Sequence, residues 1–421
     1  MSKTSAGLLF IGNGGAAISA VRAARAVGYE SPIQMISDTC GDTFNPMLSP
    51  YYLAGHIPFE RCFPFGREFY TSHGVTCHFG SPVEVLDPFS KEARLADGRV
   101  LTYDRCLVAT GARPVLPRVS GIDQSRYVYT LRTAEDAIHL SKAVERAKDV
   151  LVLGASLIGL KMAEILLSKG ARVTLVDVAE HVLPSVAHPR CAAIVEEVVR
   201  NRGVDLRLKR SLSGVEDGRE RAGFHFQDGE TVEADLCLVS IGIEPRVGFI
   251  DASQVMIDKG IVVDHRMRTS AEDLYAAGDV SQGMNLVTGH KEIIGLWGNA
   301  CYQGRAAGYN MAGREARYRG AVPEHVSTLF GLNFVHLGNV NLSEGETEII
   351  ADPGLSEYGY HLLCFEKGIL KGANLLQDPG HAGRLKTAIL RRFDWTRELD
   401  KLRPYPDRSV LDRILCAWFG A

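Results

Sequence analysis

The sequence predicts an α/β fold with two domains built on parallel sheets and a smaller α+β domain at the C-terminal end. Two observations carry this prediction. A short apolar strand runs into a glycine-rich turn and a helical pattern near residue 12, and the same order recurs near residue 154. In each case a second strand follows and ends in an aspartate. This order is the fingerprint of a Rossmann-like dinucleotide-binding unit, so we expect two of them.

The first fingerprint occupies residues 8–38, with its strand at 8–11 and its second strand at 33–37. Gly12 permits the tight turn, Gly14 leaves room for a pyrophosphate, and a small residue at 17 lets the helix pack closely. Asp38 can accept hydrogen bonds from ribose hydroxyls. A glycine turn used only for packing is the alternative, but strand, helix and acid in register favour a cofactor site. Its expected residues are Gly12, Gly14, Gly15, Ala16, Ala17 and Asp38.

The second fingerprint occupies residues 150–177, with its helix expected at 160–169. Ser156 replaces the middle glycine but is small enough to lie near a phosphate. Asp177 stands at the ribose position, and no arginine follows it at 178 or 179, which favours NAD over NADP. One duplicated structural unit is the alternative to two dinucleotides, but the second ribose acid argues against it. The expected residues are Gly154, Ser156, Leu157, Ile158, Gly159, Asp177 and Gly242.

Length and composition fit a globular protein of several domains. The 421 residues exceed one ordinary core, and the chain is 46% hydrophobic and 23% charged. A net charge of −3 gives no reason to expect nucleic acid or an anionic membrane as a partner. The first apolar run is too short for a signal peptide or a membrane span, so we expect a cytoplasmic protein. The nine cysteines are scattered without a C-x-x-C pair, so we expect reduced thiols and no metal site.

Outside the fingerprints, three apolar runs end in glycine and predict further buried strands. They lie before Thr110, at 236–241 and at 274–276. Asp97 and Gly98 predict a hairpin tip, and prolines at 46 and 50 exclude a regular helix before Tyr51. From about Tyr318 the apolar runs shorten, glycines at 368 and 372 predict a hairpin, and 410–419 predicts a last helix. These residues should form the third, smaller domain.

Four motifs in order resemble the pyridine nucleotide oxidoreductases, a family of two-dinucleotide flavoproteins that includes ferredoxin and rubredoxin reductases and NADH oxidases. They are GNGGAA at 12–17, ATGARP at 109–114, GASLIG at 154–159 with Asp177, and AAGDV at 276–280. The resemblance implies FAD in a first domain that an NAD domain interrupts. The FAD-binding domain would then consist of two segments, 1–117 and 246–320, with the NAD-binding domain at 118–245 between them. A C-terminal interface domain would follow at 321–421.

The resemblance places the first fingerprint on the ADP half of FAD. Thr110 and Gly111 would lie at the crossover between the domains, and Asp279 would bind the ribityl chain or the pyrophosphate. Arg132 would approach the flavin phosphates, although a solvated linker arginine fits this position nearly as well. The remaining FAD contacts expected from the resemblance are Val83, Ala109 and Gly278.

Trp297 and Asn299 match a W-x-N-A segment of the family at the start of a helix. A helix N-terminus aimed at the flavin pyrimidine ring would stabilise the reduced flavin anion. A tryptophan that only fills the core is the alternative, but a glycine-flanked tryptophan beside a helix start favours flavin contact. We therefore expect Trp297 in the catalytic site and Asn299 beside it.

Two departures from the family bear on chemistry. Disulfide reductases and peroxidases of the family carry a redox cysteine shortly after the first acid, whereas this chain has Leu48, Ser49 and Pro50 there, so no redox thiol is expected at the flavin. Lys161 stands where many relatives have a glutamate. We expect it to supply a catalytic cation near flavin N5, with a plain surface lysine as an equally weighted alternative.

Without a thiol or cluster ligands, electrons that enter as hydride must leave the chain. An iron–sulfur centre on a partner is favoured, because flavin divides hydride into single electrons. Residues 45–55 are similar to FAD subunits of NAD-reducing 2-oxoacid (phenylglyoxylate) dehydrogenase complexes of anaerobic aromatic metabolism, which implies partner subunits with thiamine diphosphate and iron–sulfur clusters. The alternatives are a free-standing NADH:ferredoxin or rubredoxin reductase and a flavin-bearing interaction protein. Four C-terminal histidines, His325, His336, His361 and His381, are expected to be satisfied or solvated.

Overall fold

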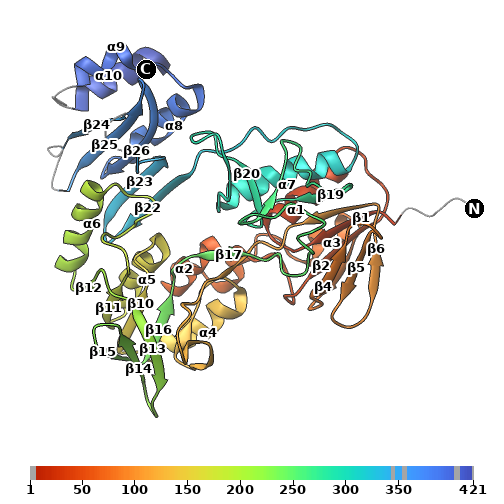
Figure 1. Cartoon of the computed structure of the whole chain (residues 1–421), viewed down its shortest axis with the longest axis horizontal. Helices are drawn as coiled ribbons and strands as arrows, with labels where there is room; N and C mark the ends of the chain where they lie inside the picture. Colours follow the sequence, from red (N-terminus) through yellow and green to blue (C-terminus); the bar gives the residue numbers. More distant parts are fainter. Residues whose placement is uncertain (1–5, 343–346, 353–357, 403–407, 420–421) are drawn as a thin grey trace, which may run out of the picture. The chain divides into compact units, whose positions relative to one another are not determined.

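The computed structural model describes residues 6–342, 347–352, 358–402 and 408–419 (Figure 1). Contacts divide the chain into two compact units. Unit 1 comprises Met1–Arg113, Arg132–Ala134 and Ile243–Ala321, and unit 2 comprises Pro114–Leu131, Glu135–Gly242 and Val322–Ala421. Two parallel sheets and a C-terminal antiparallel sheet confirm the predicted fold class. The finer division into domains stays a prediction.

Unit 1 is built on a five-stranded parallel sheet in the order β19-β7-β1-β2-β3. Its strands are β1 (Leu8–Ile11), β2 (Ile33–Ser37), β3 (Val75–Phe79), β7 (Arg105–Val108) and β19 (Leu274–Ala276). All four residues of β1 are buried, as its continuous apolar run predicts. The strand β19 joins this sheet from the second half of the chain, so two distant segments build one domain.

Two parallel helices, α1 (Gly15–Ala26) and α7 (Trp297–Met311), pack against each other in unit 1 (Figure 1). A Cβ on Gly304 would lie 2.0 Å from the Ala16 carbonyl oxygen, and one on Gly308 would lie 2.2 Å from that of Ala20. The two backbones therefore touch at glycine. Because 304 faces 16 and 308 faces 20, the helices run in the same direction and their N-termini point to the same end.

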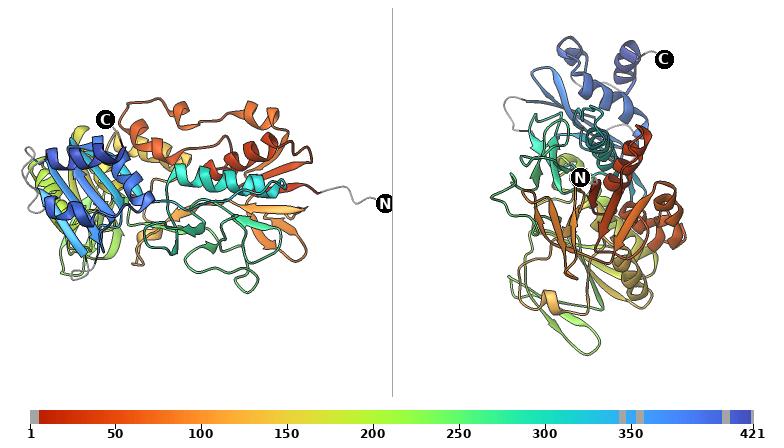
Figure 2. Two further views of the ribbon diagram at one scale, coloured as in Figure 1. Left: turned by 90° about the horizontal axis from the view of Figure 1, so that it is seen from above. Right: turned by 90° about the vertical axis from the view of Figure 1, so that its right-hand side faces the viewer.

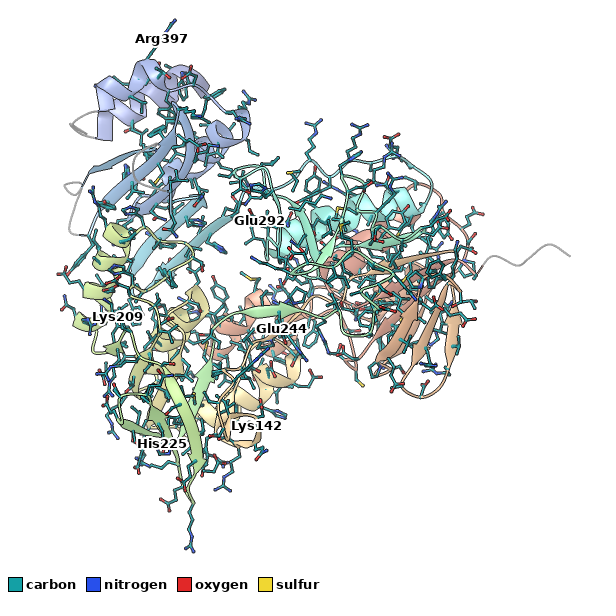
Figure 3. All side chains as sticks on the ribbon, in the orientation of Figure 1. Lys142, Lys209, His225, Glu244, Glu292 and Arg397 are labelled. Carbon is teal, nitrogen blue, oxygen red and sulfur yellow. The ribbon has the colours of Figure 1, made fainter. Side chains whose placement is uncertain are left out.

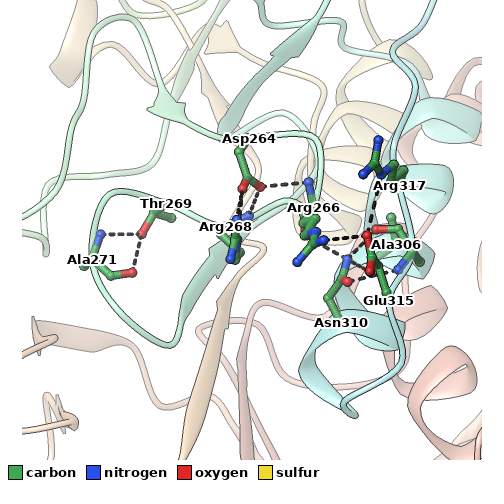
Figure 4. Close-up of polar contacts among 10 residues, drawn as sticks. Asp264, Arg266, Arg268, Thr269, Ala271, Ala306, Asn310, Glu315 and Arg317 are labelled. Atoms are coloured by element: carbon green, nitrogen blue, oxygen red, sulfur yellow. Dashed lines mark hydrogen bonds and ion pairs between the residues drawn. The ribbon is translucent and has the colours of Figure 1, made fainter.

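The C-terminal end of α7 is held by Asn310 (Figure 4). Its Nδ2 donates to the carbonyl oxygens of Arg266 and Ala316, at 3.0 and 2.8 Å, and its Oδ1 accepts from Ala316 N–H at 3.0 Å. The neighbouring loop is closed by Asp264, which accepts from the backbone N–H of Arg266 and of Arg268. These bonds fix the end of α7 to the loop before β19.

Short elements complete unit 1. The antiparallel strands β4 (Val83–Asp87), β5 (Glu92–Leu95) and β6 (Val100–Thr102) include the hairpin predicted at Asp97 and Gly98. The others are β8 (Ala112–Pro114), β17 (Ile243–Pro245), β18 (Ile261–Val262), β20 (Ser281–Met284), β21 (Lys291–Glu292), η1 (Pro46–Leu48), α2 (Ser49–Leu53), η2 (Phe59–Cys62) and α3 (Arg67–Ser72). The expectation of no helix before Tyr51 is wrong, because α2 begins at Ser49. Pro50 lies in its first turn, where no backbone N–H is needed.

Unit 2 contains a second parallel sheet in the order β12-β11-β10-β16-β9. Its strands are β9 (Val128–Tyr129), β10 (Asp149–Leu153), β11 (Arg172–Val176), β12 (Asp205–Arg207) and β16 (Leu236–Val239). Around it are α4 (Ala134–Val144), α5 (Leu157–Ser168), α6 (Pro189–Asn201), η3 (Ile122–Gln124) and the antiparallel strands β13 (Leu212–Asp217), β14 (Ala222–Phe226) and β15 (Thr231–Ala234). The helix α5 begins three residues before the predicted start, and β16 ends two residues before the predicted end.

The residues after 321 form an antiparallel sheet in the order β22-β23-β26-β25-β24. The strands are β22 (Glu324–Leu329), β23 (Leu332–Gly338), β24 (Thr347–Asp352), β25 (Tyr360–Glu366) and β26 (Ile369–Leu376), followed by η4 (Pro379–His381), α8 (Ala382–Arg391), α9 (Thr396–Leu402) and α10 (Arg408–Phe419). The helix α8 packs on β23 and β26, and the helices lie beside the strands in both views of Figure 2. The hairpin at Gly368 and the last helix are confirmed.

Side-chain contacts join this C-terminal sheet to the Rossmann-like region of unit 2. Asn374 on β26 accepts from the His188 backbone N–H at 2.9 Å and donates to the Val186 carbonyl oxygen at 2.9 Å. Within the described ranges, no helix combines the length and the apolar character that a membrane crossing requires.

Candidate dinucleotide-binding sites

The turn between β1 and α1 brings three strands of unit 1 together at Gly12. The Gly12 N–H donates to the Ile36 carbonyl oxygen at 2.8 Å, and a Cβ would lie 2.2 Å from the Ala109 carbonyl oxygen. Its φ of +115° also requires glycine. Gly14 is different, because a Cβ there would have no neighbour within 4 Å among the described residues. Gly12 therefore shapes the turn, whereas Gly14 leaves open space beside the backbone.

The start of α1 has no acceptor of its own among the described residues. Gly14 is the N-cap, no side chain caps the helix and no acid stands in its first turn. The first intrahelical bond runs from Ile18 N–H to the Gly14 carbonyl oxygen at 3.1 Å, so the N–H groups of Gly15, Ala16 and Ala17 precede it. An uncapped helix start beside an open glycine fits the pyrophosphate of a dinucleotide.

The start of α7 is similarly open and lies beside the first fingerprint. Trp297 is its first residue, and neither a capping side chain nor an acid is found there. A Cβ on Gly15 would lie 3.0 Å from the indole of Trp297, so the tryptophan packs closely against the first turn of α1, and its predicted flavin contact stays a prediction. Asn299 donates to the Ile294 carbonyl oxygen at 3.0 Å and accepts from the Tyr318 hydroxyl at 2.9 Å. Its amide therefore holds the helix start, and its predicted flavin contact stays a prediction.

Two acid–arginine pairs lie after strands of the unit 1 sheet. Asp279, after β19, pairs with Arg132 at 2.7 Å, which brings together two residues predicted to contact FAD. The alternative of a solvated linker arginine does not apply, since 26% of the Arg132 side chain is exposed and it is bound to Asp279. Asp38, after β2, pairs with Arg246. No sequence pattern singled out Arg246, which stands 208 residues from its partner.

The crossover after β7 lies between these pairs. Ala109 N–H donates to the Ile11 carbonyl oxygen at 2.7 Å, and the Thr110 hydroxyl donates to the Arg246 carbonyl oxygen at 2.8 Å. Gly111 has a φ of +66°, and a Cβ there would lie 3.5 Å from the guanidinium of Arg132. Gly278 has a φ of +84° beside Ala16. Val83 opens β4 and packs on the core, so its predicted FAD contact stays a prediction.

Gln303 is a buried polar residue of α7 that no motif indicated. It is 1% exposed, and its Oε1 accepts from Gly278 N–H at 2.7 Å and from the Ser281 hydroxyl at 3.2 Å. It thereby fixes the glycine turn before Asp279. The only available sequence signal was a glutamine on a helix face otherwise lined by small residues.

The position of the missing redox thiol is buried at the start of α2. Ser49 is 0% exposed, and its hydroxyl has no hydrogen-bond partner among the described residues. Because protein atoms already cover this hydroxyl completely, it is an unpaired polar atom of the interior and not a contact point for a group from outside the chain. Pro50 follows it, and Cys62, the nearest buried cysteine along the chain, has its thiol pKa raised by burial.

The second fingerprint repeats the tight turn but closes its helix end. Gly154 has a φ of +109°, and a Cβ on Gly159 would lie 1.9 Å from the Gly154 carbonyl oxygen. Ser156 is the N-cap of α5, and its hydroxyl accepts from Gly159 N–H at 3.1 Å. This cap explains why the helix begins at Leu157, followed by Ile158, rather than at residue 160. The predicted NAD contacts of this turn and of the open Gly242 stay predictions.

Asp177 is oriented by two backbone groups. Its Oδ2 accepts from Ala155 N–H at 2.6 Å and its Oδ1 from Ala179 N–H at 2.8 Å, so the carboxylate lies beside the glycine turn. This position fits a ribose-binding acid.

Basic residues follow β12, the strand next to Asp177, and the sequence directly after Asp177 gives no sign of them. Arg210 N–H donates to the Asp177 carbonyl oxygen, and Lys209 N–H to that of Ala179, both at 3.0 Å. Lys209, labelled in Figure 3, pairs with Glu180, and Arg210 pairs with Asp228. The positive charges of Lys209 and Arg210 near the ribose position are thus already compensated by acids.

Lys161 is bound inside unit 2. Its ammonium donates to Glu164 Oε2 at 2.8 Å and to the Thr328 carbonyl oxygen at 3.0 Å, and 22% of its side chain is exposed. It joins α5 to β22 and is not a freely solvated surface lysine. Its predicted role near flavin N5 stays a prediction.

Comparison with known proteins agrees with this geometry. The sequence profile of the family described as pyridine nucleotide-disulphide oxidoreductase matches residues 7–304. Subunit epsilon of the NADH-dependent phenylglyoxylate dehydrogenase of Aromatoleum evansii is 32% identical over 391 residues, which is 92% of each chain. Putidaredoxin reductase of Pseudomonas putida is 28% identical over 398 residues, again 92% of each chain.

Among solved structures, the crystal structure of the covalent putidaredoxin reductase–putidaredoxin complex is similar over the whole chain. It superposes with a TM-score of 0.88 at 26% identity and covers 99% of both chains. The similarity includes the residues after 321, which the family profile does not reach.

Proposed function

The chain belongs to the pyridine nucleotide-disulphide oxidoreductase family, and we propose that its first fingerprint binds FAD and its second binds NAD. The family consists of FAD-dependent NAD(P)H oxidoreductases, so the chain is a flavin oxidoreductase that transfers electrons to partners. The observation that carries the assignment of FAD is the pair of parallel helices α1 and α7, whose uncapped starts point to the same end beside the open Gly14.

The residues around these helix starts have distinct tasks in the proposal. FAD, when bound, accepts a hydride and passes on its electrons one at a time. The start of α1 binds the pyrophosphate, and the start of α7 stabilises negative charge on the flavin ring. Trp297, the first residue of α7, packs beside Gly15 and would contact the flavin. Asp38 binds the ribose of the ADP half and Asp279 binds the ribityl chain or the pyrophosphate, and each acid is oriented by an arginine.

NAD is proposed over NADP for the second fingerprint. Asp177 would accept ribose hydroxyls but repel a 2′-phosphate. Lys209 and Arg210, the nearby cations, are paired with Glu180 and Asp228 and would have to leave these acids to bind the phosphate.

We propose an iron–sulfur protein as the electron-transfer partner. No thiol stands at the start of α2, where Ser49 and Pro50 occupy the first turn, so the chain offers no internal acceptor there. The relative named as a subunit of phenylglyoxylate dehydrogenase supports a place in a 2-oxoacid dehydrogenase complex, with thiamine diphosphate and clusters on other subunits. In that setting the flavin would collect electrons and reduce NAD. A free-standing NADH:ferredoxin reductase is the second candidate, supported by the similarity to putidaredoxin reductase.

Purification from the native source at mild salt, with measurement of iron and identification of co-purifying chains, separates these candidates. The complex predicts iron and further subunits in constant ratio. An iron-free chain that purifies alone and reduces ferredoxin rapidly with NADH supports the free-standing reductase. Slow NADH oxidation with every one-electron acceptor would instead make the chain an interaction protein whose flavin activity is incidental.

A further inference from the structure

Arg246 lies at the point where the chain returns to unit 1, and both its backbone and its side chain are fixed. Its N–H donates to the Gly111 carbonyl oxygen at 3.0 Å, and its carbonyl oxygen accepts from the Thr110 hydroxyl at 2.8 Å. These bonds join the segment that leads into β8 to the segment that follows β17. Its guanidinium points to Asp38 and binds Oδ2.

We propose that Arg246 is a positioning residue for the adenosine half of FAD, acting through Asp38. This inference rests on the proposed assignment of FAD to the first fingerprint. The carboxylate of Asp38 has two oxygens and about four acceptor sites. Arg246 occupies Oδ2, and Oδ1 has no partner among the described residues, so one oxygen remains for a ribose hydroxyl while the other is held in place.

The positive charge of Arg246 should also strengthen FAD binding. Asp38 places a negative charge at the ribose position, close to where the anionic pyrophosphate would meet the start of α1. The paired guanidinium compensates that charge. The Asp38 and Arg246 side chains are 35% and 41% exposed, so a bound nucleotide that covers them would reduce solvent screening and strengthen the pair.

The crossover holds a matched ion pair with no such role. Arg113 pairs with Glu244 on β17, labelled in Figure 3, and their side chains are 67% and 48% exposed. Arg113 on β8 and Glu244 on β17 pair with each other, whereas Arg246, directly after β17, contacts an acid of the first fingerprint. Arg113→Met is therefore the control for Arg246→Met, because each removes one guanidinium and keeps most of the side-chain length.

The test is the affinity of flavin-depleted protein for FAD and for ADP, measured by calorimetry for wild type, Arg246→Met, Asp38→Asn and the double variant. We expect Arg246→Met to weaken both ligands about tenfold, and Arg246→Lys to recover only some of the loss because lysine lacks the planar fork. Arg113→Met should bind both ligands like wild type. Since Arg246 acts through Asp38, adding Arg246→Met to Asp38→Asn should cause little further loss.

The outcomes separate this inference from the function it rests on. If the wild-type chain fails to bind FAD, the proposed function fails and the inference fails with it. If wild type binds FAD and Arg246→Met binds FAD and ADP equally well, only the inference is overturned. The inference would also be overturned if the losses of binding free energy in the two single variants added up to the loss in the double variant, because Arg246 would then act independently of Asp38.

Discussion

Gly12 and Gly14 stand two residues apart in one turn, but the space around their Cα atoms differs. A side chain at Gly12 would strike the Ala109 carbonyl oxygen and occupy a left-handed conformation, whereas a side chain at Gly14 would meet no described atom. The first glycine is therefore required by the fold. The fold does not require the second, which leaves space that the proposed cofactor would use.

We predict that Gly12→Ala destabilises unit 1 by more than about 3 kcal/mol, from backbone strain and the clash together. Gly14→Ala should change stability by less than about 1 kcal/mol, the usual range for a change at an N-cap. It should nevertheless weaken FAD binding at least about tenfold, because the new methyl group occupies the space of the pyrophosphate. Denaturant unfolding and FAD titration measure the two effects. Unchanged FAD affinity in Gly14→Ala would contradict this assignment.

His336 on β23 makes the stability of the C-terminal sheet depend on pH. Burial, with a contribution from the neighbouring His325, lowers the pKa of His336 to about 3. In the unfolded chain the pKa is about 6.5, so below that pH the unfolded state binds a proton that the folded state does not. Stability is therefore full above about pH 6.5 and falls as the pH is lowered, by about 2 kcal/mol at pH 5 from this group.

We expect His336→Phe, which keeps an aromatic ring but cannot titrate, to lose about 2 kcal/mol less than wild type between pH 7.5 and pH 5. Urea unfolding followed by the fluorescence of Trp395 and Trp418, both in the C-terminal helical region, measures this difference. His139→Gln, on α4 and away from the C-terminal sheet, is the control and should behave like wild type. Equal losses in His336→Phe and wild type would contradict the prediction.

The sequence predicted residues whose role is local and missed those whose role depends on distant partners. Gly12 and Gly154 follow from spacing within one turn, and Asp177 follows from its place in the fingerprint, at the end of the second strand. Arg246 and Gln303 do not, because no motif relates them to their partners, which lie 208 and 25 residues away and are brought close only in the folded chain. Composition alone gives no signal for such pairs.

The contact of α1 with α7 is the element-scale feature on which the first site depends. Gly304 and Gly308 let the helices approach until their backbones touch, and this approach aligns their two N-termini. A wider spacing would move the start of α7 away from the glycine turn. The packing of α7 on α1 therefore both fills the core and positions the two helix starts of the first site.

Gly304→Ala should destabilise unit 1 by about 3 kcal/mol, because the new Cβ would lie 2.0 Å from the Ala16 carbonyl oxygen and the helices would have to separate. Gly298→Ala is the matched control in the same helix. A Cβ there has no neighbour within 4 Å among the described residues, so alanine should raise stability by about 0.5 kcal/mol through its helix propensity. Denaturant unfolding without added FAD compares them, and equal effects would refute the role assigned to this contact.

The starts of α5 and α2 differ from the predicted ones. The sequence indicated a helix after the second fingerprint, but Ser156 caps it and moves its start to Leu157. Pro50 was expected to exclude a helix before Tyr51, yet a proline in the first turn lacks only an N–H that the helix does not use. Both differences arise from capping, which depends on backbone conformation that residue type only partly determines.

At the scale of the whole molecule, the two units divide the proposed work. Unit 1 holds the fingerprint with the open helix starts, and unit 2 holds the fingerprint whose helix is capped by its own serine. The order of motifs along the chain predicted two parallel sheets, one built around each fingerprint, and both are present. The attachment of the C-terminal sheet through Asn374 and Lys161 was not predictable, because neither residue belongs to a motif that specifies a contact.

The central claim is that one chain pairs FAD with NAD, and anaerobic reduction of the FAD-loaded protein tests it most directly. We predict about one FAD per chain and rapid bleaching of the flavin absorption by about one equivalent of NADH. NADPH should react at least about tenfold more slowly, because Asp177 repels the 2′-phosphate. A protein that retains no flavin, or whose flavin NADPH reduces as fast as NADH does, would contradict the claim.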